Sequence, residues 1–294
     1  MPPPAFRRRS ATLARAVRTA AVLGSVGVAA GGAGFVPPGP PPSTPAPGVL
    51  RIIGGPPTGG CIAGAVRLPE RGTGFVTIRQ DRSDVWGAPQ TIERIALLGR
   101  QAAAAGLPEL LIGDISHPRG GPMGGGHVSH QRGLEVDIGL DMRPRAPLMT
   151  AGERRGVELS SLVRLDRRGI EPSRWNPGVV TLLRLAATLP EVDRVLVNPA
   201  IKKQLCEEVT GDRAWLRLIR PWYAHAAHMH ITFRCPPGQA ECTQASPPPA
   251  GDGCDATLQW WFDQLDAPAP PKPGPPPKAP PMPEACRAVF AAPG

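Results

Sequence analysis

The chain has 294 residues, with 33 lysines and arginines against 24 aspartates and glutamates, which gives a formal net charge of +9 at pH 7. Five of those arginines lie in residues 1–36, which hold no acidic residue, so the remainder carries 28 basic and 24 acidic side chains. This mild excess suits approach to an anionic polymer, but an ordinary solvated surface is the favoured interpretation. No basic stripe interleaved with aromatic residues is present, which argues against a nucleic-acid partner.

The first predicted element is an export signal over residues 1–36. A basic head that contains Arg7, Arg8 and Arg9 precedes an Ala- and Gly-rich apolar run from about Thr19 to Val36, which is the pattern of a secretory signal peptide. An uncleaved membrane anchor is the alternative, but the run is barely long enough and only weakly apolar. We therefore expect no stable membrane span after removal of the signal.

A single folded domain is predicted between two proline-rich segments. Residues 37–48 read as a proline-rich spacer, 49–265 as the domain and 266–294 as a proline-rich C-terminal tail. Helix signals in the domain cover residues 90–105, 177–189, 200–209 and 256–265, and strand signals cover 110–115, 134–140, 194–198 and 228–233. Their irregular alternation favours an α+β fold, with helices flanking a central, mainly antiparallel sheet.

Six cysteines lie beyond the predicted signal, and none form a CxxC pair, which disfavours a cysteine-based zinc knuckle. In an exported chain, an even number of cysteines predicts three disulfides. Their spacing does not choose among the pairings of Cys61, Cys206, Cys235, Cys242, Cys254 and Cys286.

Five of the six histidines lie in two short segments, His127–Asp137 and His225–His230. Side chains two apart on a strand share a face, so His228 and His230 point together, and Asp137 lies on the polar face of its own strand. His130 enters that strand through a turn at Gly133. Two neighbouring strands would thus bring His130, Asp137 and His230 to one point.

Two imidazoles and a carboxylate that leave a fourth position to water are typical of a catalytic zinc site. Zinc would activate the water and polarise a substrate carbonyl. His228 and His225 are the candidate catalytic helpers. Glu135 shares a face with Asp137 and is expected to hydrogen-bond a ligating imidazole. An HxH pair alone occurs often by chance, but the HxxGxxxD pattern that starts at His130 makes a metal site the favoured interpretation.

The aromatic residues of the domain have two possible interpretations, a groove lining or a place in the core. Trp222 and Tyr223, beside the histidines, either line a groove or pack in the core, and core packing is the default for Trp260 and Trp261. The sequence lacks four motifs of other enzyme classes: HExxH, the nucleophile elbow, the phosphate loop and the dinucleotide fingerprint. The absence of HExxH excludes the zincin class.

The sequence SHQRGLEVDIGL, with GDIS and PRGG before it, resembles the penicillin-insensitive murein endopeptidases. So do VNPAIKKQLCEEVTGDRAWL, RPWYAHAAHMHITFRCP, and GDGC followed by WWF. These proteins belong to the wider group of zinc metallopeptidases that includes lysostaphin, D-Ala-D-Ala peptidases and hedgehog domains. The resemblance covers about residues 50 to 265.

The resemblance implies a periplasmic zinc enzyme that cleaves the D-alanyl–diaminopimelyl cross-link of peptidoglycan. It further implies a role for each matching residue. The metal ligands are His130, Asp137 and His230, with His127 close to the metal, and the assisting histidines are His225 and His228. The implied disulfides are Cys61–Cys286, Cys206–Cys254 and Cys235–Cys242.

Two alternative functions and one question of assembly stay open at this point. A non-catalytic peptidoglycan-binding protein on the same fold would bind sacculi without cleavage. A D-Ala-D-Ala carboxypeptidase would trim an uncross-linked pentapeptide. Whether the chain forms a homodimer is also open.

Overall fold

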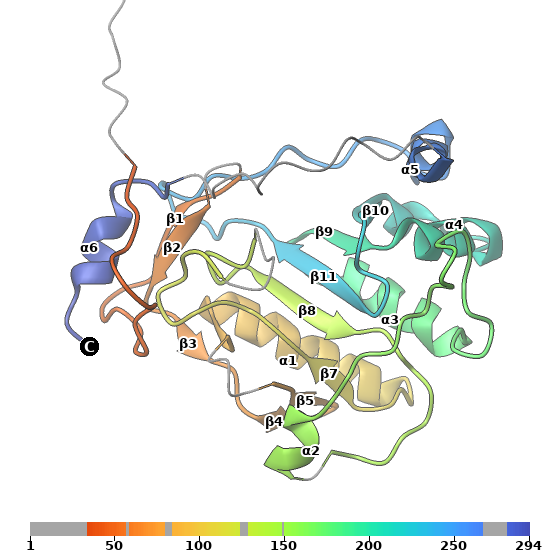
Figure 1. The fold of residues 1–294 in the computed structure, drawn as a ribbon, viewed down its shortest axis with the longest axis horizontal. Coiled ribbons are helices and arrows are strands. Elements are labelled where there is room, and N and C mark those ends of the chain that lie inside the picture. The colour runs from red at the N-terminus through yellow and green to blue at the C-terminus, as the bar shows by residue number, and fades with distance from the viewer. Residues whose placement is uncertain (1–33, 57–58, 80–83, 124–128, 149, 267–280) are drawn as a thin grey trace, which may run out of the picture. The chain divides into compact units, whose positions relative to one another are not determined.

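The structure is a computed structural model of the chain, and it describes residues 34–56, 59–79, 84–123, 129–148, 150–266 and 281–294 (Figure 1). All of these residues belong to one unit, Ala33–Gly294. Residues 1–33, which hold most of the predicted signal peptide, lie outside the described residues. Within the described ranges, no helix combines the length and the apolar character needed to cross a membrane.

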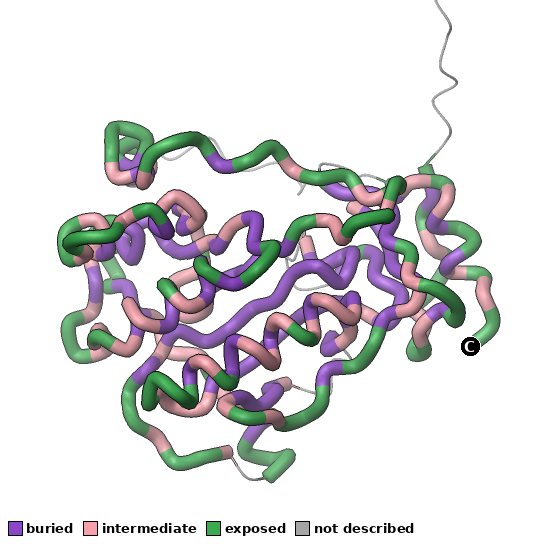
Figure 2. The backbone as a smooth tube through the Cα atoms, turned by 180° about the vertical axis from the view of Figure 1, so that it is seen from behind, coloured by how far each residue is buried: buried purple, intermediate pink, exposed green. Residues whose placement is uncertain are grey.

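A seven-stranded mixed sheet forms the centre of this unit, in the order β10-β9-β11-β8-β7-β5-β4. The middle pairings β9–β11, β11–β8 and β8–β7 are antiparallel, whereas β10–β9 and β5–β7 are parallel. Strands β8 and β11 are buried along almost their whole length (Figure 2). The strands are β4 (Arg71–Gly72), β5 (Phe75–Thr77), β7 (Leu110–Ile112), β8 (Glu135–Gly139), β9 (Val192–Val197), β10 (Ile219–Pro221) and β11 (His228–Phe233).

Helices α1 (Pro89–Ala104) and α3 (Pro177–Ala187) lie behind the sheet in Figure 1 and come to the front in Figure 2. Their buried side chains join those of the sheet in one large core, which includes Leu98, Leu182 and Ile138. Helix α4 (Pro199–Glu208) packs beside β10. Each of these helices has a proline in its first turn, where a missing N–H leaves no backbone hydrogen bond unmade.

Shorter elements complete the unit. Two small sheets pair β1 (Arg51–Gly54) with β2 (Gly60–Ala63) and β3 (Val66–Arg67) with β6 (Trp86–Gly87). The remaining helices are α2 (Ala151–Arg155), the 3₁₀ helix η2 (Ala214–Leu218), α5 (Ala256–Asp266) and α6 (Cys286–Ala291).

The two ends of the described chain form a smaller core beside β1 and β2. Phe35 exchanges two backbone hydrogen bonds with Met282, at 2.8 and 2.9 Å, and its buried ring contacts Phe290 with centroids 5.6 Å apart. The buried Arg119 side chain donates to the carbonyl oxygens of Val289 and Phe290, both at 3.0 Å. Residues 281–294, assigned by sequence to the proline-rich tail, therefore include a packed helix.

The structure joins the six cysteines as Cys61–Cys286, Cys206–Cys254 and Cys235–Cys242, with Cα–Cα separations of 5.8, 5.6 and 5.9 Å. These are the pairs that the resemblance implies. The α+β class, the single domain and the central sheet flanked by helices are confirmed, and the sheet is mixed at both edges around an antiparallel middle.

Candidate metal centre

Three side chains converge at the middle of the sheet: His130, Asp137 and His230. Asp137 Oδ1 lies 3.1 Å from His230 Nδ1 and 3.3 Å from His130 Nε2, and these two ring nitrogens are 3.0 Å apart. All three side chains are buried. Over the ranges that the structure describes, they form the one group of three His, Cys, Asp or Glu residues with ligand atoms close enough to hold a metal ion.

The pairing of two central strands places Asp137 and His230. Strands β8 and β11 run antiparallel, and their register sets His230 directly opposite Asp137. Because side chains alternate along a strand, both residues point to one face of the sheet. Their neighbours Ile138 and Met229 belong to the hydrophobic core. A shift of this register by one residue would turn a ligand into that core.

His130 reaches the same point from the loop that precedes β8. Its φ of 64° is a left-handed conformation, which in a residue with a Cβ costs about 1–3 kcal/mol and needs support from its surroundings. The support comes from Glu135, whose carboxylate accepts the backbone N–H of His130, and from the carbonyl oxygen of Ile115, 3.0 Å from Nδ1. Gly133 continues the turn. A Cβ at this position would lie 2.9 Å from Gly87 Cα, so a residue with a larger side chain does not fit.

The geometry of the three ligand atoms fits zinc. A carbonyl oxygen only accepts, so the contact with Ile115 puts a hydrogen on His130 Nδ1 and, in the neutral ring, the lone pair on Nε2. Tetrahedral ligands at 2.0–2.1 Å from a zinc ion are separated from one another by about 3.3 Å. The observed separations of 3.0, 3.1 and 3.3 Å come close to that value.

The charges of the metal-free cluster follow from its contacts. Burial opposes a charge on His130, but the facing Asp137 carboxylate and nearby Glu135 raise the pKa of His130 to about 9. Burial also opposes the charge on Asp137, yet His130 and His230 hold the pKa of Asp137 well below its ordinary value. At neutral pH the metal-free cluster therefore pairs a protonated His130 with an ionised Asp137, and a bound cation would replace that proton.

His225 and His228 lie beside the cluster: His225 is on the segment that leads into β11, and His228 is the first residue of that strand. His228 Nε2 is 3.6 Å from Asp137 Oδ2, and the His225 ring centroid is 5.3 Å from that of His228 and 5.8 Å from that of His230. Burial and the nearby His230 lower the pKa of His225 to about 4, so its ring is neutral at pH 7. Its Nδ1 lies 2.9 Å from the Tyr223 carbonyl oxygen, which places the ring's lone pair on Nε2.

His225 lies in a strained turn. Ala224 and His225 have φ values of 62° and 38°, which non-glycine residues adopt only where the surroundings hold them. The backbone N–H of Asn198 donates to the carbonyl oxygen of His225 at 2.9 Å, and the Asn198 side-chain amide donates to that of Ala224 at 2.9 Å. Asn198 Oδ1 also caps α4 by accepting the Ala200 N–H at 3.0 Å. One side chain thus anchors the turn to a helix.

The structure brings five of the sequence-predicted residues together: His130, Asp137, His230, His225 and His228. Glu135 contacts His130 as well, but through the backbone N–H, because the Ile115 carbonyl already occupies the ring's Nδ1. His127 lies outside the described residues, and its place near the metal stays a prediction.

Sequence reasoning missed Ile115 and Asn198. Ile115 acts through its backbone carbonyl, which has no signature in the sequence. Asn198 has one signal, the Asn-Pro pair that starts α4, but that signal predicts a helix cap and not a contact with a residue 26 positions away.

Comparison with known proteins identifies similar chains over most of the described unit. The profile of the family described as penicillin-insensitive murein endopeptidase matches residues 53–291. A penicillin-insensitive murein endopeptidase of Klebsiella pneumoniae is 45% identical over 235 residues, which cover 79% of this chain and 83% of that protein. One of Salmonella heidelberg is 43% identical over 250 residues, which cover 84% of this chain and 88% of that protein.

Proposed function

The chain belongs to the penicillin-insensitive murein endopeptidase family, and we propose that it is a zinc-dependent peptidase that hydrolyses D-alanyl–diaminopimelyl cross-links in peptidoglycan. The observation that carries the proposal is the convergence of His130 Nε2, Asp137 Oδ1 and His230 Nδ1 at separations that suit one zinc ion. His225 and His228 beside these atoms supply the groups that proton transfer needs.

A zinc ion in this cluster would supply a Lewis acid and a water of lowered pKa. His225 is neutral at pH 7 with its lone pair on Nε2, so it accepts a hydrogen bond from the attacking water and orients it. His228 carries the proton that the water gives up to the leaving nitrogen, as the bond from carbon to the water oxygen forms and the carbon–nitrogen bond breaks. Glu135 keeps His130 in its left-handed conformation.

We place this activity in the periplasm. Three disulfides suit an oxidising compartment, and the substrate lies outside the cytoplasm. The signal peptide at 1–36, the spacer at 37–48 and the boundary of the catalytic domain at 265 stay predictions. The burial of Phe35 against Met282 and Phe290 favours a signal shorter than 1–36, processed before Phe35.

The test is incubation of the purified mature protein with cross-linked muropeptide dimers, followed by chromatography and mass measurement of the products. We expect conversion of dimers to monomers that a chelator stops and zinc restores, in the presence of penicillin. Hydrolysis that persists after complete removal of metal would refute the zinc mechanism. Intact dimers, with trimming of an uncross-linked pentapeptide, would replace the proposal with a carboxypeptidase, and binding without any cleavage would replace it with a wall-binding protein.

A further inference from the structure

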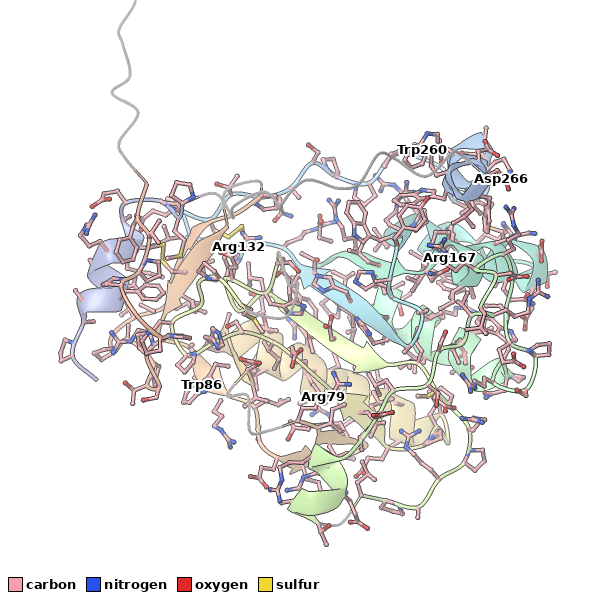
Figure 3. The ribbon with its side chains drawn as sticks, viewed as in Figure 1. Arg79, Trp86, Arg132, Arg167, Trp260 and Asp266 are labelled. Carbon is pink, nitrogen blue, oxygen red and sulfur yellow. A yellow bond between two sulfur atoms is a disulfide. The ribbon has the colours of Figure 1, made fainter. Side chains whose placement is uncertain are left out.

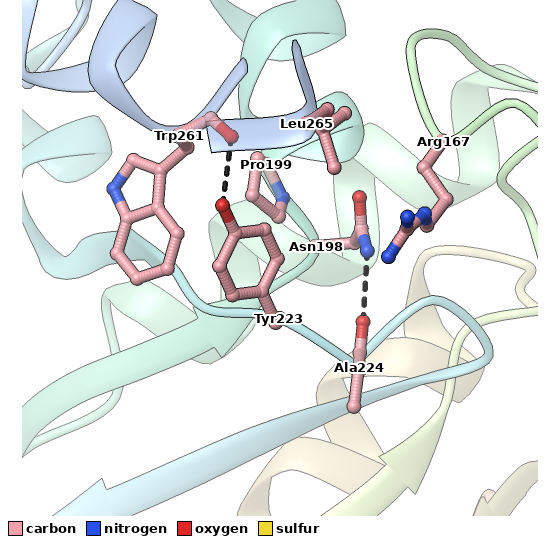
Figure 4. A pocket seen from close by; sticks show the side chains of 7 residues that line it. All are labelled: Arg167, Asn198, Pro199, Tyr223, Ala224, Trp261 and Leu265. Atoms are coloured by element: carbon pink, nitrogen blue, oxygen red, sulfur yellow. Dashed lines mark hydrogen bonds between the residues drawn. The ribbon is translucent and has the colours of Figure 1, made fainter. Parts of the chain in front are cut away.

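A small pocket lies next to the proposed catalytic histidines (Figure 4). Ala224, the residue before His225, forms part of its wall, and so does Asn198, whose side-chain amide donates to the Ala224 carbonyl. Helix α5 contributes Trp261 and Leu265 on the opposite side. The pocket thus shares the strained turn with the proposed active site, and a molecule bound in it would contact the turn that carries His225.

The hairpin that carries Arg167 closes another side of the pocket. Val163 and Ile170 form the bridge at its base, and Leu162 next to that bridge donates its backbone N–H to the Ala226 carbonyl at 2.7 Å. Arg167 is therefore tied through the backbone to the segment between His225 and His228. Its φ of 59° is a strained conformation that the hairpin imposes at the point nearest the pocket.

Arg167 differs from its two arginine neighbours in its partners. Arg164 pairs with Asp166 at 2.8 Å, and Arg168 pairs with Asp266 of α5. Among the described residues, no carboxylate forms an ion pair with Arg167, which is labelled in Figure 3, although this residue lines the pocket (Figure 4). A guanidinium in this situation offers a planar fork of donors to a carboxylate.

The rest of the wall is aromatic and apolar. Tyr223 and Trp261 contact each other with centroids 4.8 Å apart, and the Tyr223 hydroxyl donates to the Trp261 carbonyl at 2.8 Å. Trp222 and Trp260 extend this surface. Their ring centroids lie 5.7 and 5.2 Å from that of Trp261, and the two residues are 53% and 52% exposed. The N-cap Asn198 and the first residue of α4, Pro199, line the pocket, and the positive end of the helix dipole favours an anion.

We propose that this pocket binds a carboxylate of the substrate's stem peptide, with Arg167 as its partner and Tyr223 and Trp261 against the adjoining alkyl chain. The inference rests on the proposed function, since diaminopimelyl and terminal D-alanyl groups both join a carboxylate to a short alkyl chain. A carboxylate held here would fix the peptide beside His225, so Arg167 is a specificity residue and not a ligand of the metal.

The test compares Arg167→Ala with Arg164→Ala, which removes the same charge from the same hairpin outside the pocket. The substrates are muropeptide dimers with free carboxylates and dimers amidated at those carboxylates. We expect Arg167→Ala to lower kcat/KM for the free-carboxylate dimer about 10- to 100-fold, mainly through KM. Its effect on the amidated dimer should be less than about threefold, Arg164→Ala should match the wild type, and zinc content should be unchanged. Dimers amidated at one position at a time identify the carboxylate.

Two results separate failure of this inference from failure of the proposed function. If the wild type cleaves both dimers and Arg167→Ala lowers both rates equally or neither, the carboxylate pocket is refuted and the endopeptidase stands. If the wild type cleaves neither dimer, calorimetric binding of an uncross-linked stem tetrapeptide still decides. Weaker binding after amidation or after Arg167→Ala supports the pocket, and equal binding overturns it.

Discussion

The candidate metal cluster of His130, Asp137 and His230 and the rim beside it, formed by the proposed catalytic residues His225 and His228, depend on different kinds of structure. Asp137 and His230 face each other because two buried central strands pair in one register. His225 instead lies in a partly exposed, left-handed turn that hydrogen bonds from Asn198 hold in place. The sheet fixes Asp137 and His230 through many backbone contacts, whereas His225, like the third candidate ligand His130, relies on a few polar contacts. Substitutions in the two regions should therefore separate metal binding from catalysis.

The largest effect is expected from Asp137→Asn, which removes the carboxylate charge and keeps the size of the side chain. The variant should lose bound zinc and lower kcat/KM by about 10³-fold or more, since hydrolysis then lacks its Lewis acid. Zinc content by elemental analysis and dimer hydrolysis provide the measurement. Asp141→Asn, just beyond β8 and paired with Arg143, is the matched control and should retain both. Retained zinc and activity in Asp137→Asn would show that the cluster is not the metal site.

Next in size are the effects of His225→Ala and His228→Ala. Each should lower kcat about 10²- to 10⁴-fold, the range for loss of a proton-transfer group, while zinc content stays near that of the wild type. The contrast with Asp137→Asn is the informative part, because it separates a group that assists the reaction from one that holds the metal. Loss of zinc in His228→Ala would instead make His228 a ligand.

Metal affinity should rise with pH. The pKa of His130 in the metal-free protein is raised to about 9, so a proton competes with zinc below that pH and the competition disappears as pH rises through it. Asp137, with its pKa held low, stays ionised throughout. Affinity should increase about tenfold per pH unit, or about 100-fold between pH 6 and 8, with release of one proton. Calorimetry in two buffers of different ionisation enthalpy measures that proton. A flat affinity would contradict the pairing of His130 with Asp137.

The smallest of these effects is expected from Asn198→Ala, which removes both a helix cap and the side-chain hydrogen bond to Ala224. Stability should fall by about 1 kcal/mol, as for loss of an N-cap, and kcat should fall about tenfold at unchanged zinc content. Asn176→Ala is the matched control, because Asn176 caps α3 in the same way away from the site. Equal loss of activity in both variants would show that the rim does not depend on Asn198.

The sequence predicts the metal cluster and the rim to different extents. The alternation in residues 134–140 and 228–233 predicts both central strands, and it puts Asp137, His228 and His230 on polar faces. Periodicity does not give the register that sets His230 opposite Asp137, so the sequence reaches the ligand set only when the histidine and aspartate motifs are considered together.

The sequence predicts His225 and His228 themselves, but it does not predict the contacts that hold them or the packed helix at the C-terminal end. The link between Asn198 and Ala224, and the pocket between Arg167 and Trp261, join segments far apart in the chain, and no local pattern encodes them. Helix α6 has six residues, too few for periodicity to show, and isolated helices of that length are unstable. It forms because Cys61 and Arg119 attach it to the body.

The most direct test of the metal assignment is anomalous diffraction at the zinc edge from crystals of the mature protein loaded with zinc. The predicted result is one peak about 2.0–2.2 Å from His130 Nε2, His230 Nδ1 and Asp137 Oδ1, with His225 and His228 beside it but not bound. A zinc ion held by other side chains, or no peak at this cluster in a catalytically active preparation, would contradict the assignment.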